Sequence, residues 1–84
     1  MRYTHTATVP PVNAYCLDQV AWELYCQRRY READEIMRSA LECGLVEAKF
    51  LFHAGLIAYA VGRKDEALLR VKQALALDPR VHTR

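Results

Sequence analysis

The sequence contains 84 residues, of which 52% are hydrophobic and 26% are charged, and its formal net charge is +2. This length allows one domain with a modest core, and the composition excludes a disordered chain. Because acidic and basic residues are interleaved, the charge does not point to nucleic acid or a membrane as partner. No secretory signal is visible, and the longest apolar run, Phe50–Val61, is too short to span a bilayer. We therefore expect a cytoplasmic protein.

The cysteine pattern favours free thiols. Cys16, Cys26 and Cys43 are an odd number and lack CxxC or Cys/His ligand spacing. Cys16 and Cys26 are too far apart along one predicted helix to form a disulfide. We expect a reducing compartment, no metal site and no cofactor.

The first 13 residues, MRYTHTATVPPVN, show no helical period. Pro10 and Pro11 favour an extended chain, so no helix is expected before about Val12, and Asn13 is the predicted N-cap. We expect residues 1–13 to form a flexible, extended arm. A second interpretation is an arm that packs on the protein or on a neighbouring chain.

The first predicted helix, Ala14–Gln27, carries two stripes of side chains turned by roughly 100° from each other. The stripe expected to face the core consists of Leu17, Val20, Ala21 and Leu24. The other stripe consists of Tyr15, Asp18, Trp22 and Tyr25. Arg28 and Arg29 form the predicted turn, and their basic side chains favour a solvated turn over a phosphate contact.

Three more helices are expected. The second, Tyr30–Cys43, ends at Gly44, which suits a left-handed C-cap. The third, Glu47–Val61, ends at Gly62. The fourth, Lys64–Leu77, is stopped by Asp78 and Pro79, and residues 80–84 are expected to form a tail. The residues of the second and fourth helices expected to face inward are Ala33, Ile36, Met37, Ala40 and Leu41, and Ala67, Leu68, Val71, Ala74 and Leu75. In the third helix, Ala54, Gly55 and Ala58 are small enough for close helix approach.

The sequence repeats itself at an offset of 34 residues. When Ala14–Leu45 is placed on Ala48–Pro79, eight columns are identical, among them Tyr25/Tyr59, Arg29/Arg63 and Glu32/Glu66. A fixed period of this length is typical of a stacked helical repeat. The prediction is therefore an all-α domain over residues 14–79, with repeats at 14–47 and 48–79 and four antiparallel helices.

The residues that mark each repeat resemble the tetratricopeptide repeat, a 34-residue helix–turn–helix unit. The second repeat matches this pattern at Ala54-Gly55, Tyr59, Gly62, Ala67, Val71, Ala74 and Leu77-Asp78-Pro79, and the first at Leu17, Ala21, Leu24, Tyr30, Ala33, Met37 and Ala40. The first repeat departs from it at Arg28, where the family often has glycine, and at Leu45, where it has proline. The resemblance implies a right-handed superhelical stack that acts as a protein-binding scaffold.

In this family the first helix of each repeat lines a concave surface that binds ligands. The resemblance assigns to that partner groove Tyr15, Asp18, Trp22, Tyr25, Lys49, Phe52, His53, Leu56 and Tyr59. Only Lys49 resembles the basic set with which some members bind a terminal carboxylate, so we expect an apolar peptide or helix instead. The alternative is that Trp22, Phe52 and Leu56 only pack the repeats together.

A second surface is expected on the fourth helix. Such arrays usually end in a polar capping helix, and none follows the second repeat here. The outer side of Lys64–Leu77 is then left open, and a large exposed apolar patch usually marks an interface. We expect self-association into a homodimer through Leu68, Leu69, Leu75 and Leu77.

No catalytic site is expected. His53 has no acidic neighbour on its own helical face, and Cys43 has no base beside it in sequence. The leading hypothesis is a non-enzymatic protein–protein interaction module that binds a peptide or protein partner and self-associates. The alternative is a purely structural self-assembling repeat, as a closed dimer or a stack, without a separate client. RNA binding is a weaker idea, because the charge is nearly balanced.

Overall fold

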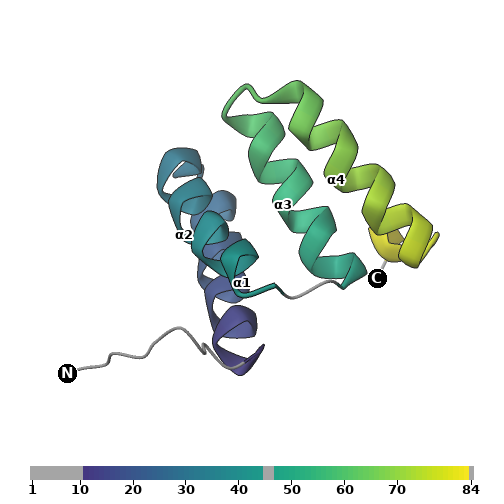
Figure 1. Cartoon of the computed structure of the whole chain (residues 1–84). Coiled ribbons are helices and arrows are strands. Elements are labelled where there is room, and N and C mark those ends of the chain that lie inside the picture. The colour runs from purple at the N-terminus through teal and green to yellow at the C-terminus, as the bar shows by residue number, and fades with distance from the viewer. Residues whose placement is uncertain (1–10, 45–46, 84) are drawn as a thin grey trace.

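The computed structural model describes residues 11–44 and 47–83 and shows an all-α fold, as expected. The described chain forms two helical hairpins that lie side by side with their turns at the same end (Figure 1). The helix α3 contacts every other element, since it packs on α4 within its hairpin, on both helices of the other hairpin and on the short 3-10 helix η1. The elements are α1 (Pro11–Cys26), α2 (Tyr30–Glu42), α3 (Ala48–Ala60), α4 (Lys64–Leu77) and η1 (Val81–Thr83).

The predicted ends of the chain need correction. Helix α1 begins at Pro11, before the predicted start, so Asn13 lies inside the helix and not at its N-cap. Proline is well suited to a first helical position because its missing N–H would have no partner there. Residues 1–10, including the suggested anchors Tyr3 and Val9, lie outside the described chain.

The segment after Pro79 is not a simple tail. It forms η1, and Val81 packs in a small cluster with Leu51 and Ala74. Val81 is buried there because α3 and α4 leave apolar surface uncovered at this end of the hairpin. This contact explains why the chain stays ordered past the helix stop at Asp78.

The two hairpin turns are built alike, bond for bond, at the 34-residue offset. Arg29 N–H donates to Leu24 C=O and Arg28 N–H to Tyr25 C=O, both at 2.9 Å. Arg63 and Gly62 repeat these bonds in the second hairpin. This pattern is the Schellman motif, in which the residue after the helix adopts a left-handed conformation. That residue is Gly62 in one turn, with φ of 93°, and Arg28 in the other, with φ of 65°.

An exchange between the two turns tests this assignment. A positive φ carries a cost for a residue with a Cβ that glycine avoids. We expect Arg28→Gly to raise the free energy of unfolding by about 0.5–1 kcal/mol and Gly62→Arg to lower it by about 1 kcal/mol. Urea unfolding followed by circular dichroism measures both changes. Gln27→Gly, one residue earlier and not at positive φ, is the control and should destabilise; an equal gain from that variant would contradict the explanation.

Alanines dominate the core. Ala21, Ala33, Ala40 and Ala74 are fully buried, and Met37 and Ile57 are the largest fully buried side chains. The predicted inward stripe of α2 is confirmed, since Ile36 and Leu41 pack against its buried alanines. The stripes of α1 and α4 were partly wrong, because Val20, Leu68 and Leu75 are exposed. The helices approach so closely that the core has no room for these larger side chains.

Gly55 is the point of closest approach between α3 and α4. A Cβ at this position would lie 2.7 Å from Val71 Cγ2 and 3.1 Å from the Ala67 carbonyl oxygen. The first distance is well inside van der Waals contact, and the backbone of α4 cannot yield as a side chain would. The predicted packing role of the small residues on α3 is therefore confirmed.

We expect Gly55→Ala to destabilise the protein, although alanine is the better helix former. The clash should outweigh the propensity gain and leave a net loss of about 1–3 kcal/mol. Val71→Ala removes the nearest clashing atom, so the loss caused by Gly55→Ala should be smaller in that background. A double-mutant cycle in chemical denaturation measures this coupling. Additive effects of the two changes would show that Gly55 is not tight against Val71.

Candidate binding surface on helices α1 and α3

Three contacts join α1 to the α3 region, and each involves a residue predicted to line the groove. His53 on α3 contacts Asp18 and Trp22 on α1, and Tyr15 donates a hydrogen bond to the carboxylate of Glu47 just before α3. The bond to Glu47 raises the pKa of the Tyr15 hydroxyl, because it stabilises the protonated phenol. The fold thus brings together the two stripes that the sequence places 34 residues apart.

His53 is the buried member of this group, with 7% of its surface exposed. Its Nδ1–H donates to Asp18 Oδ1 at 3.0 Å, and its ring stacks on Trp22 with centroids 4.0 Å apart and planes inclined by 14°. A buried polar group needs such a partner. The sequence interpretation missed this partner because it considered only acids near His53 on its own helix.

A row of aromatic rings extends from His53 toward the hairpin turn. Trp22 stacks on Tyr25 at 4.8 Å between centroids, and Tyr25 contacts Tyr30 at 5.4 Å with the rings tilted. Burial in this row raises the pKa of the Tyr25 hydroxyl, with smaller contributions from Tyr30 and Cys26. Trp22 and Tyr25 therefore make internal contacts while both remain half-buried.

The other predicted groove residues keep surface open to a ligand. Tyr59 is 63% exposed and Tyr15 47% exposed, and Lys49 is also exposed. Phe52 and Leu56 are half-buried. The face therefore combines a fixed floor, built on His53, with exposed aromatic groups around it.

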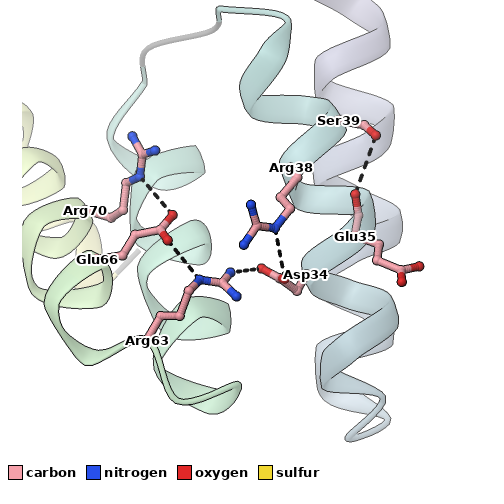
Figure 2. A network of polar contacts seen from close by, with 7 residues as sticks. All are labelled: Asp34, Glu35, Arg38, Ser39, Arg63, Glu66 and Arg70. Carbon is pink, nitrogen blue, oxygen red and sulfur yellow. Dashed lines mark hydrogen bonds and ion pairs between the residues drawn. The ribbon is translucent and has the colours of Figure 1, made fainter.

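A chain of ion pairs ties the two hairpins together on the α2 side (Figure 2). Asp34 on α2 accepts hydrogen bonds from Arg63, at the turn between α3 and α4, and from Arg38 at 3.2 Å. Arg63 also donates to Glu66 at 2.9 Å, and Glu66 lies 3.8 Å from Arg70 Nε. The hydrogen bond to Asp34 raises the pKa of the Arg63 guanidinium. We had placed Asp34 among the outward residues, but it is half-buried in this chain.

A hollow of about 1020 Å³ lies where the two turns meet, lined by residues of both turns. Its basic side chains include Arg28, Arg29, Arg31 and Arg63. Two of them are already engaged, since Arg29 pairs with Glu32 at 2.6 Å and Arg63 with Asp34. With three acidic side chains also lining it, this hollow has no strong preference for an anion.

The four leucines predicted for self-association are all exposed, but they do not form one patch. Leu68, Leu69 and Leu75 run along one side of α4. Leu77 lies on a different side, where it lines a second pocket of about 410 Å³ together with Leu41 and Leu51.

Among residues 11–44 and 47–83, no group of three or more His, Cys, Asp or Glu side chains could hold a metal ion. No helix in this part of the chain is long and apolar enough to cross a membrane. Comparison of the chain with known protein families, curated proteins and solved structures gives no match.

The contact between His53 and Asp18 predicts a measurable coupling. We expect His53→Ala to cost about 2 kcal/mol of unfolding free energy and Asp18→Ala about 1 kcal/mol, because each removes one partner of a buried hydrogen bond. The double variant should lose about 1 kcal/mol less than the sum. Gln19→Ala, an exposed neighbour on α1, is the control and should change stability by less than about 0.5 kcal/mol. Strict additivity of the first two changes would show that the hydrogen bond contributes nothing.

Proposed function

We propose that this protein is a non-enzymatic protein–protein interaction module of the tetratricopeptide-repeat type. In this proposal the two hairpins are successive units of a right-handed stack, with α1 and α3 on its concave side. The 34-residue period and the matching bonds of the two turns support this interpretation. So does the position of α3, which contacts both helices of the preceding hairpin.

The observation that carries the proposal is the exposed aromatic face of α1 and α3. Tyr15 and Tyr59 leave about half or more of their surface open, beside the half-buried Phe52 and Leu56. Aromatic side chains with one open side are common anchors of protein interfaces. The rigid contact of His53 with Asp18 and Trp22 holds this face in place, which lowers the ordering cost of binding. An apolar peptide or an amphipathic helix is the partner that suits such a face.

We further propose that the module self-associates through α4, whose exposed leucines form a second apolar surface. The same observation supports a second candidate function, a self-assembling structural repeat without a client. The two candidates differ in what covers Phe52 and Tyr59 in the assembled state. A sister chain covers them in the structural protein, whereas they stay free in the binding module.

Selection of peptides from a displayed random library tests the binding face. We expect the selected peptides to be apolar or amphipathic, and Tyr59→Ala to weaken their binding about tenfold, the loss expected for an aromatic anchor. Phe52→Ala should have a similar effect. Trp22 is a poor choice for this test, because its replacement also removes the stack on His53.

Leu77→Ala is the matched control, because it removes an exposed apolar side chain from a different surface. Its peptide affinity should equal that of the original chain, measured by fluorescence anisotropy. Peptides whose binding ignores Phe52 and Tyr59 would overturn the assignment of this face.

A further inference from the structure

The exposed side of α4 carries a regular seam. Its residues follow the spacing i, i+3, i+4, i+7, i+10 and i+11, which places them on one face of a helix. They are Asp65, Leu68, Leu69, Lys72, Leu75 and Ala76, and all six are exposed. In a monomer this face would present three leucines to water.

The same positions of the other hairpin show that this apolar seam is not a general property of the repeat. At the 34-residue offset, Leu68 and Leu69 correspond to Asp34 and Glu35 on α2. Ala76 likewise corresponds to Glu42. The residues of α2 at the seam positions are Arg31, Asp34, Glu35, Arg38, Leu41 and Glu42. The two helices otherwise share buried alanines at equivalent positions, so the difference is specific to the exposed side of α4.

The two charges of the seam lack an opposite charge. The neighbours of Lys72 at three and four residues are Leu68, Leu69, Leu75 and Ala76. Asp65 has no basic neighbour at these spacings either, and neither residue forms an ion pair with any other part of the described chain.

We propose that α4 pairs with α4 of a second copy, antiparallel and around a two-fold axis that passes between Leu68 and Leu69. Asp65 precedes Leu68 by three residues, and Lys72 follows Leu69 by three. The axis therefore brings Asp65 of each copy level with Lys72 of the other, and this forms two equivalent ion pairs. Leu68 of each copy then faces Leu69 of the other, at the centre of the contact. This inference specifies the self-association proposed above and rests on it.

The charges select this arrangement over the other ways of covering α4. A parallel pair would place Asp65 against Asp65 and Lys72 against Lys72, which repel. A head-to-tail stack would use a different surface of the second copy and would continue into a filament. The two-fold arrangement satisfies both charges, covers the leucines and closes after two copies.

Sedimentation velocity across about a hundredfold range of concentration tests the assembly, since a dimer forms by mass action. The unaltered chain should reach the mass of a dimer and no more. Leu68→Asp combined with Leu69→Glu gives α4 the side chains of α2 and should yield a monomer of unchanged helicity. A monomeric unaltered chain, or masses that keep growing with concentration, would overturn the proposal.

Charge reversal tests the two-fold register. Asp65→Lys alone places lysine against lysine twice, and Lys72→Asp alone places aspartate against aspartate twice. Each should weaken the dimer about tenfold or more. An equimolar mixture of these two variants should restore dimers as heterodimers, because both pairs are then opposite in charge. The double variant Asp65→Lys, Lys72→Asp should also dimerise.

Native mass spectrometry distinguishes the heterodimer from either homodimer. Glu23→Lys makes the same charge change at an exposed site on α1 and should leave dimerisation unchanged. Failure of the mixture to form heterodimers would overturn the antiparallel register. Peptide binding by the Leu68→Asp, Leu69→Glu variant, measured in parallel, separates this inference from the binding face. Retained binding in a monomer that never dimerised would refute the inference and leave the face of α1 and α3 intact.

Discussion

The close approach of helices to α3 is the constraint on which the rest of the structure depends. This helix contacts α1, α2, α4 and η1, and its small residues Ala54, Gly55 and Ala58 make that possible. At Gly55 the space for even one more methyl group is absent. A core of small residues holds few large side chains, so several leucines and tyrosines remain at the surface. The packing that fixes the fold therefore also creates the two apolar surfaces available to partners.

Polar contacts set how the hairpins meet, more than how strongly they hold. Asp18 and His53 join α1 to α3, while Asp34 and Arg63 join α2 to the second turn. Arg63 remains partly exposed, so its ion pair is screened by water and contributes little to stability. Hydrogen bonds of fixed direction nevertheless specify one register between two otherwise smooth alanine-rich surfaces. Apolar packing and polar contacts thus have separate tasks in this small domain.

Local patterns predicted the helices well. The bounds of α4 were predicted to the residue, and Gly44 and Gly62 adopt the left-handed conformation expected of helix C-caps. The contacts between hairpins could not be read in this way, because they depend on how two helices lie against each other. Asp18 and His53 stand 35 residues apart, close to the repeat period, and that spacing was the available signal. Neighbouring repeats place such positions side by side, so a search at the period would have found the pair.

Differences between equivalent positions of the two hairpins carry the remaining information. Tyr25 is half-buried because it packs on Trp22 and Tyr30. Its equivalent, Tyr59, has Leu56 and Lys64 at the corresponding positions, and it is largely exposed. In the same way, Asp34 of α2 contacts the following hairpin, whereas its equivalent Leu68 faces outward. Where a repeated sequence keeps a residue but loses its internal neighbour, or replaces a charge by a leucine, that position is free to contact another molecule.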